Sequence, residues 1–550
     1  MKKTIISLIS AAVLVPLFAI GVDFKPLKKP QYKLYTICAG KIPNTSDEDL
    51  RLIAKNFEFY HGKFTTEQAD AIRKINPAFK CLTYINSTYT RTEEDVRIVE
   101  SKYREGLCMM LAANLQQSID ANCTKFSVSP YVNEKRKAKN QTAIAIRAST
   151  IEGDFSSYEN DKPSTQFYVF WIRIGDELMR VNKFDAVTGE VEVTRGFSGS
   201  KPTLHNSGDK VFSPLYLGFE RIKLNREDQL TMGGDKYPGF HPGGPGKFLR
   251  YVLDPCKDTY QFQADIVLQL MQKDRVDGVW LDTFNCGVFN ISDCLGRAAR
   301  PWDFSKNQEY ALDDFRFGQE KKITFIQNFI KEKLGKYPIL VANNLNDDYE
   351  IGKGGMKLLL MPTEVKPRPL EAFCMEGGLA IQKVDKWKSR IMVLMDAAQN
   401  GLAAAPVWEN AGSVSFNSET DTPLRDKAER FGYASFLLGV EKDSKTLMGT
   451  YAFYQAEGKR FVKIHPMYYY PIGFPIQTVK PESIDNYLIK DLPVYRRSFT
   501  KGLVLVNPSD KECEVKLDKS FLDPDTHQLV VTIIMPPSTG KILLTNPSGK

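Results

Sequence analysis

Two short apolar runs of this chain each end in a carboxylate. Val276–Phe284 contains Asp282, and Ala372–Gly378 contains Glu376. Apolar runs of this length predict strands that are buried on both faces. The carboxyl ends of such strands meet at one rim of a parallel barrel, where reactive groups gather. Two acids at that rim suit glycosidic bond cleavage, because one can protonate the leaving oxygen while the other attacks the sugar or activates water.

Other acids compete for these roles. Glu364 and Glu371 are close to Glu376 in the chain and could take its place. Asp254 also ends a strand-like run, either as a substrate ligand or as a turn residue before a proline. Asp277 begins the strand that Asp282 ends, so we interpret it as a turn residue at the opposite rim.

Aromatic and amide side chains at the same rim are candidates for substrate binding. A sugar ring offers an apolar face and a rim of hydroxyl groups, which these side chains can contact. The candidates are Tyr84, Asn86, Asp254, Asn343, Trp408 and Glu409. Ordinary packing or loop polarity is the alternative for each of them. Trp280 points opposite to its neighbours in the strand, and we predict that it belongs to the core.

Other catalytic chemistries have little support in the sequence. The five histidines do not form a HExxH motif or accompany a GxSxG motif, although His61 ends a strand-like run and could join a site. No CxxC motif or Cys/His cluster suggests a structural metal, and Asn346–Asp348 is only a weak calcium candidate. We therefore expect no metal and no cofactor.

Strand-like runs alternate with helical patterns along much of the chain. The helices include Thr65–Ile75, with a Thr cap, and Phe315–Leu334, with Gly335 as its stop. A longer helical pattern covers Thr92–Gln117, and Leu424–Leu438 would close the ring. The eight runs are Lys33–Cys38, Asn56–Tyr60, Lys80–Asn86, Lys247–Asp254, Val276–Asp282, Pro338–Asn343, Glu371–Glu376 and Leu402–Trp408. The alternation predicts an α/β fold, a (β/α)₈ TIM barrel. A doubly wound sheet is the alternative, which the lack of a glycine-rich loop after the first run weakens.

Two further regions depart from this alternation. Residues 127–245 are too long for a loop and alternate with period two, which predicts an inserted antiparallel β module between barrel parts 22–126 and 246–445. Within it, Arg195 and His205 suggest either a binding site or, as we prefer, a hydrogen-bonded turn. Residues 446–550 contain short strands separated by Pro/Gly turns, which predict a C-terminal β-sandwich.

The bulk composition predicts a packed protein of several domains. The chain has 550 residues, of which 42% are hydrophobic and 25% charged, with a net charge of +8. No basic run is interleaved with aromatic residues, so we expect no nucleic-acid partner.

The first residues predict export. Lys2 and Lys3 precede the apolar run Thr4–Val15, and small residues follow at Ala19–Gly21, which is typical of a signal peptide over residues 1–21. We therefore expect a secreted or periplasmic protein with no stable membrane insertion after cleavage. The alternative is a membrane anchor, since the uncleaved stretch is about long enough to span a bilayer.

Export would permit disulfides among the nine cysteines. Cys286 and Cys294 are the best candidate pair, in the loop after Asp282, and Cys108 and Cys123 are a second. The alternative is that several cysteines, such as Cys374, are small buried apolar residues.

Several segments, taken in order, resemble known families. Phe57–Tyr60, Lys80–Asn86, Asp277–Asp282, Ala372–Gly377 and Tyr495–Pro508 are similar to segments of the TIM-barrel group called glycosyl-hydrolase-like family 15. Within residues 127–245, Gly175–Val181, Gly189–Ser200 and His205–Gly208 resemble a β module of phage tail proteins and some carbohydrate-active enzymes. The first resemblance implies that Asp282 and Glu376 form the catalytic pair. This chain departs from the group in its large insertion and in having Ala372 and Phe373 where an Asp-Gly pair is expected.

These observations predict a secreted glycoside hydrolase that acts on a polysaccharide or oligosaccharide. Asp282 would be the nucleophile or base and Glu376 the general acid. One alternative is a TIM-barrel protein that binds carbohydrate without cleaving it. The other is a polysaccharide lyase, for which the mild positive charge would suit an acidic substrate.

Overall fold

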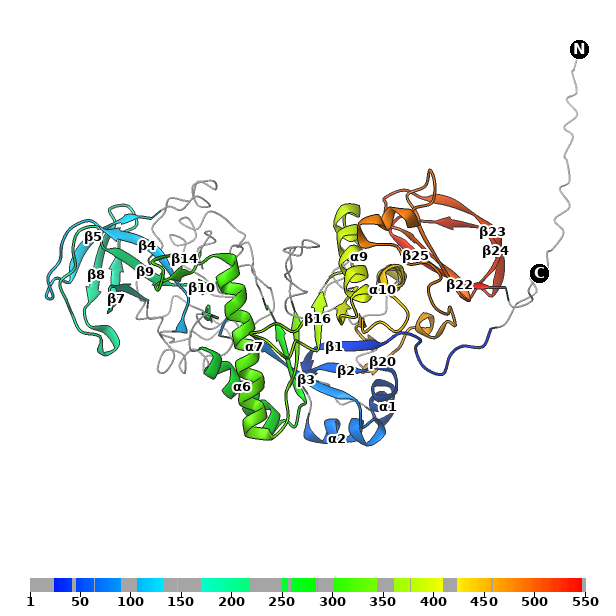
Figure 1. Cartoon of the computed structure of the whole chain (residues 1–550), viewed down its shortest axis with the longest axis horizontal. Helices are drawn as coiled ribbons and strands as arrows, with labels where there is room; N and C mark the ends of the chain where they lie inside the picture. Colours follow the sequence, from blue (N-terminus) through cyan, green and yellow to red (C-terminus); the bar gives the residue numbers. More distant parts are fainter. Residues whose placement is uncertain are drawn as a thin grey trace, which may run out of the picture.

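The fold centres on a parallel eight-stranded barrel (Figure 1). The computed structural model describes residues 24–41, 46–63, 65–90, 106–131, 146, 170–217, 250–255, 259–282, 284, 300–343, 361–375, 377–408, 423–456 and 459–546. The strands run in the order β17-β16-β15-β12-β3-β2-β1-β18, and a parallel bridge between Val407 and Gly449 links the last two edges. They are β1 (Leu34–Lys41), β2 (Phe59–Lys63), β3 (Lys80–Asn86), β12 (Gly278–Asp282), β15 (Ile339–Asn343), β16 (Ala372–Met375), β17 (Ala404–Pro406) and β18 (Met448–Thr450).

Helices surround this barrel, and local sequence sets their ends. The described ones are α1 (Asp47–Asn56), α2 (Thr66–Ile75), α6 (Thr259–Lys273), α7 (Leu312–Leu334), α9 (Val384–Gln399) and α10 (Pro423–Gly439). Thr65 caps α2 through the amide of Gln68, 3.2 Å away, and Gly335 ends α7 at a φ of 71°. Both of these predicted helix boundaries are confirmed.

Alternate residues of the strands fill the inside of the barrel. The cluster there contains Trp280 together with Tyr35, Ile37, Phe59, Leu82, Val341, Ala372, Cys374, Ala405 and Val407. Residues of the opposite parity pack against the helices in a larger core. The prediction that Trp280 is a core residue is therefore confirmed.

Two predicted elements of the barrel are wrong. Run 247–254 is not a barrel strand; it contributes β11 (Arg250–Tyr251), which pairs antiparallel with β10 (Tyr216–Leu217). The eighth barrel strand is instead β18, which the sequence placed in the C-terminal region. The helix predicted over Thr92–Gln117 is also wrong at its end, because Met109–Leu115 forms strand β4. A continuous apolar run does not distinguish helix from strand, and pairing with β9 decides it here.

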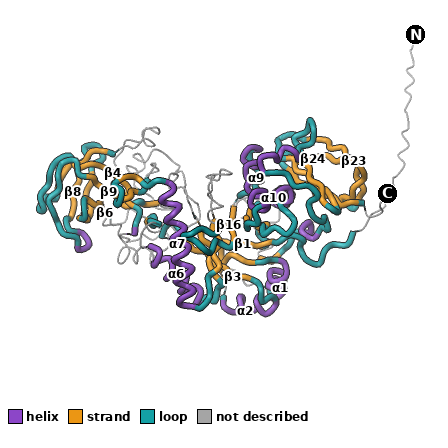
Figure 2. The backbone as a smooth tube through the Cα atoms, in the orientation of Figure 1, coloured by secondary structure: helices purple, strands orange, loops and turns teal. Residues whose placement is uncertain are grey.

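The inserted module is a closed antiparallel barrel of six strands, in the order β4-β5-β8-β7-β6-β9. Its remaining strands are β5 (Lys125–Pro130), β6 (Trp171–Ile174), β7 (Glu177–Phe184), β8 (Glu190–Thr194) and β9 (Lys210–Pro214), with a short 3-10 turn η2 (Phe197–Gly199). The module thus begins earlier than residue 127, and in the sequence it is inserted between β3 and α6. It forms one end of the molecule, next to α7 (Figure 2).

The C-terminal region contains one five-stranded antiparallel sheet in the order β21-β22-β25-β23-β24. One face of this sheet packs on α10, where a Cβ on Gly540 would lie 2.4 Å from that of Ala434. The described residues therefore form a sheet-on-helix layer that only loosely resembles the predicted sandwich. The sheet strands are β21 (Tyr495–Phe499), β22 (Gly502–Asn507), β23 (Cys513–Asp523), β24 (Gln528–Met535) and β25 (Thr539–Thr545); hairpin β19 (Phe453–Ala456) and β20 (Lys459–Val462) and 3-10 turns η4 (Pro466–Tyr469) and η5 (Pro481–Tyr487) precede them.

The cysteine and membrane predictions are tested only in part. Cys108 and Cys123 are separate free thiols, so their proposed pairing is wrong. Cys374 is buried inside the barrel as a small apolar residue. Cys286, Cys294 and the signal region lie outside the described residues. Among the helices described, none has the length and apolar character needed to cross a membrane.

Candidate functional site

Asp282 is the last residue of β12 and lies at the carboxyl rim of the barrel. Its side chain has the same parity as Trp280, so it continues the inward-facing row above the packed interior. Unlike the four strand residues before it, which are buried, Asp282 is partly exposed. The strand therefore presents a carboxylate to solvent from a rigid and otherwise buried element.

Two neighbouring strands hold this carboxylate from both sides. The Tyr84 hydroxyl, on β3, donates a hydrogen bond to Oδ2 of Asp282. The Asn343 amide, on β15, donates to Oδ1 at 2.9 Å. Because each oxygen accepts a separate bond, the plane of the carboxylate is fixed. The sequence had offered Tyr84 and Asn343 as substrate ligands, whereas in the structure both contact Asp282.

His61 adds a further polar side chain beside this trio. It is buried on β2, with its ring stacked on Trp280 at a centroid distance of 4.5 Å and an interplanar angle of 14°. The His61 and Tyr84 rings are 5.8 Å apart. Four adjacent strands, β2, β3, β12 and β15, thus contribute a continuous arc formed by His61, Tyr84, Asp282 and Asn343.

Two further candidates, Asn86 and Asp254, make hydrogen bonds that hold the surrounding structure. Asn86 accepts hydrogen bonds from the amides of Thr88 and Tyr89, both at 2.9 Å, and so shapes the turn after β3. Asp254 is buried and accepts a 3.0 Å bond from the hydroxyl of Tyr310, and the residue before it, Leu253, donates to the Thr88 carbonyl just beyond β3.

Trp408 is enclosed between the barrel wall and α10. Its ring is buried, its indole nitrogen donates to Thr450 at 3.3 Å, and its Cβ would be 2.3 Å from a Cβ on Gly432. We therefore leave Trp408 out of the proposed site.

Among the acids proposed near the second strand, only some lie within the described residues. Glu376 and Glu409 lie outside the described residues. Glu371 directly precedes β16, at the amino rim, and pairs with Arg368 at 2.5 Å. It therefore cannot face Asp282 at the carboxyl rim.

The shell behind Asp282 was not found from the sequence. Ser87 donates to the Asp282 carbonyl from both its amide and its hydroxyl, each at 3.0 Å. Lys322 and Gln263 donate in turn to the Ser87 carbonyl at 2.8 and 2.9 Å. The one signal that the sequence offered is that Lys322 lies one turn before the apolar residue Ile326 on the same side of the helix.

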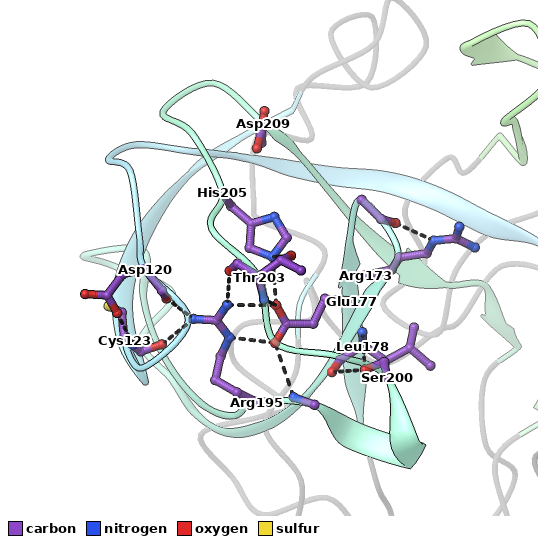
Figure 3. A network of polar contacts seen from close by, with 12 residues as sticks. Asp120, Cys123, Arg173, Glu177, Leu178, Arg195, Ser200, Thr203, His205 and Asp209 are labelled. Atoms are coloured by element: carbon purple, nitrogen blue, oxygen red, sulfur yellow. Dashed lines mark hydrogen bonds and ion pairs between the residues drawn. The ribbon is translucent and has the colours of Figure 1, made fainter.

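Glu177, Arg195 and His205 of the inserted barrel belong to a network of polar contacts (Figure 3). Arg195 makes two 2.7 Å bonds to the buried Glu177 carboxylate, and His205 makes another at 2.8 Å. Arg195 also donates to the carbonyls of Asp120, Cys123 and Thr203. These contacts tie loops together, in line with the turn interpretation of His205. Burial raises the pKa of Glu177, but the bonds from Arg195 and His205 outweigh burial and hold the pKa at about 2.

A metal centre has no support in the part of the chain that is described, where no group of three or more His, Cys, Asp or Glu residues is placed to bind an ion.

We compared the chain with protein families, curated proteins and solved structures. No protein-family model and no curated protein matches the chain. Among solved structures, Eubacterium rectale Amy13B is 10% identical over 95% of this chain and 100% of that chain, with a TM-score of 0.38. A pyruvate kinase from Cryptosporidium parvum is 10% identical over 76% of this chain and 64% of that chain, with a TM-score of 0.27. Similarities of this size do not indicate a function for this chain.

Proposed function

We propose that this protein is a glycoside hydrolase that cleaves a polysaccharide or oligosaccharide, with Asp282 as its nucleophile or base. The observation that carries the proposal is the partly exposed Asp282 carboxylate at the barrel rim, fixed by Tyr84 and Asn343. A fixed carboxylate reacts from one position and loses little entropy on reaching the transition state. Positions at the carboxyl ends of barrel strands are where TIM-barrel enzymes place such groups.

Glu376 is the proposed general acid. It follows Cys374 by two residues, and Cys374 and Ala372 both belong to the interior cluster. Strand β16 is separated from β12 by β15 alone. An acid that continued the inward-facing residues of β16 would face Asp282 across the rim. The two carboxyl groups of a glycoside hydrolase must face each other in this way to flank the glycosidic bond.

The test is cleavage of a polysaccharide panel by the purified protein, with reducing ends measured. Asp282→Asn and Glu376→Gln should each lower the rate by about 10²- to 10⁴-fold, the range expected for loss of an acid or base. Glu371→Gln at the opposite rim and Asp265→Asn on the exposed side of α6 are matched controls and should leave the rate unchanged. Full activity in Asp282→Asn would reject the assignment.

The same panel distinguishes the alternatives. Products with an unsaturated sugar would indicate a lyase. Binding of a polysaccharide without cleavage, unchanged by Asp282→Asn, would indicate a non-catalytic binding protein.

Export is part of the proposal, on the strength of Lys2, Lys3 and the apolar run that follows. Sequencing the amino terminus of the protein recovered outside the cytoplasm should start at Val22. An intact terminus retained in membranes would favour the anchor instead.

A further inference from the structure

A buried lysine lies directly behind the carboxylate site. Lys322 is on α7, with 2% of its surface exposed, directly before the core residue Ile323 and one turn before Ile326. A lysine is costly to bury, and an apolar side chain of similar volume would often be equally stable or better. The ammonium group of Lys322 must therefore be compensated by the contacts that surround it.

Lys322 contacts two residues, Ser87 and Phe284, which in turn bond to Asp282 and to its partner Asn343. Its ammonium group donates a 2.8 Å hydrogen bond to the Ser87 carbonyl. Ser87 in turn donates twice to the Asp282 carbonyl, from its amide and from its hydroxyl. The Lys322 ammonium also lies 5.3 Å from the ring centroid of Phe284. The Phe284 amide donates a 2.8 Å bond to the carbonyl of Asn343, the residue that holds Oδ1 of Asp282.

The geometry points to Lys322 as a positioning residue that holds Asp282 in its reactive orientation. This inference rests on the proposed function of Asp282. Lys322 fixes the end of β3 through Ser87 and packs on the chain just beyond β12 through Phe284. Tyr84 and Asn343 can grip the carboxylate only while the ends of β3, β12 and β15 keep their relative positions. A shift of about 1 Å in a reacting group can cost roughly 100-fold in rate.

Lys322→Met tests this role, because methionine keeps the unbranched shape and removes the donor. Gln263 still donates to the Ser87 carbonyl at 2.9 Å, so this buried carbonyl is not left without a donor. We expect kcat on the best substrate of the panel to fall roughly 10- to 100-fold, with KM and Tm nearly unchanged. A residue with only a structural role would show the reverse, a lower Tm with kcat retained, and that result would overturn the inference.

Two further variants guard the interpretation. Lys321→Met, at the neighbouring exposed position of α7, should change neither kcat nor Tm. Ser87→Ala removes one of the two bonds to the Asp282 carbonyl and should lower kcat less than Lys322→Met. Combined with Lys322→Met it should add little, because both changes act through the same chain of contacts. Fully additive losses would contradict a shared route.

A crystal structure of Lys322→Met separates this inference from the proposed function. If the wild-type protein cleaves nothing on the panel, the hydrolase proposal fails, and the positioning role is decided by the coordinates. Displacement of the Asp282 carboxylate from Tyr84 or Asn343 would support the role. Retention of both bonds in the variant would overturn it. Should Lys322→Met fail to fold, the same readouts on Lys322→Gln, a shorter and uncharged side chain, decide the question.

Discussion

At the residue scale, the decisive feature is that Asp282 is gripped by two uncharged donors from neighbouring strands. Neither donor is charged, and each of them fixes one oxygen of the carboxylate. Tyr84 and Asn343 also lie on the rigid walls of the barrel, which limits how far they can move. Hydrogen bonds to a charged group are worth about 1.5–3 kcal/mol, enough to set the orientation of a side chain.

Tyr84→Phe should therefore slow the reaction without unfolding the protein. Loss of the bond to Asp282 predicts a fall in kcat of about 10- to 100-fold, measured as initial rates on the substrate that the panel identifies. Tyr337→Phe, at an exposed tyrosine with 40% of its surface accessible, is the control and should be silent. Wild-type kcat in Tyr84→Phe would show that Asp282 does not need this donor.

A second residue-scale prediction concerns Arg195 in the inserted barrel. Arg195→Met leaves the buried Glu177 carboxylate without its main partner, which should cost about 3–5 kcal/mol. Lys183→Met breaks the exposed pair with Glu192 at 3.2 Å in the same barrel and should cost less than about 1 kcal/mol. Hydrogen exchange of β7 and β8, followed by mass spectrometry, reports this local stability. Equal exchange in the two variants would contradict the importance of burial.

The pH dependence of the inserted barrel follows from Glu177. Its pKa falls from 4.5 to about 2 on folding. Between these two pH values the folded state therefore binds fewer protons than the unfolded state. The stability that this group contributes is present above about pH 4.5 and is lost as the pH falls toward about 2. Exchange protection of β7 in the wild-type protein should therefore decline over that window. In Glu177→Gln, β7 should be less protected than in the wild-type protein at neutral pH, and this difference in protection should disappear in acid. A difference that stays the same at every pH would exclude a contribution from the ionisation of Glu177.

At the element scale, closure of the barrel depends on β18, a strand of three residues. Its central residue, Gly449, lies against the ring of Tyr35, and a Cβ there would be 2.5 Å from the Tyr35 hydroxyl oxygen. That hydroxyl is held by a 2.7 Å bond to the carbonyl of Ala405 on β17. The close approach lets β1, β17 and β18 meet at the seam.

Gly449→Ala should accordingly destabilise the barrel by about 1–3 kcal/mol, the usual cost of overpacking. Urea unfolding monitored by circular dichroism gives the change in free energy. In a Tyr35→Leu background, which removes the crowding ring, the same substitution should cost measurably less. An identical cost in both backgrounds would rule out the clash with Tyr35.

Much of this architecture is predictable from sequence, because buried parallel strands and capped helices have strong local signals. Thr65 and Gly335 mark helix ends, and the run to Asp282 marks a strand. The seam strand and β4 are not predictable in this way. Three residues carry no periodicity, and the apolar run Met109–Leu115 is a strand because of partners distant in the chain. The shell formed by Ser87 and Lys322 likewise depends on tertiary contacts, since these residues are 235 positions apart.

At the scale of the whole molecule, the inserted barrel is joined to the TIM barrel by packing as well as by its two connections. Phe315, near the start of α7, belongs to the hydrophobic core of the inserted barrel. The hairpin β13 (Trp302–Asp303) and β14 (Gln308–Glu309) adds a second contact. Phe212 on β9 lies 5.5 Å from Trp302 and 4.8 Å from Phe304, between ring centroids. This hairpin belongs to the connection that begins just after Asp282, so the same segment of chain contacts both barrels.

If these ring contacts hold the two barrels together, Trp302→Ala should loosen their relative arrangement. Trp302 is 5% exposed and also lies under the Lys210 ammonium at 4.3 Å, so its truncation should cost about 3–5 kcal/mol at the contact. Both barrels keep their own cores, and circular dichroism should be unchanged. Small-angle scattering should show a broader distribution of long distances, and limited proteolysis should cut between the barrels sooner. Phe317→Ala, at an exposed site on α7 beyond this contact, should match the wild-type protein. An unchanged scattering profile for Trp302→Ala would mean that the Phe315 contact and the two chain connections suffice to fix the inserted barrel.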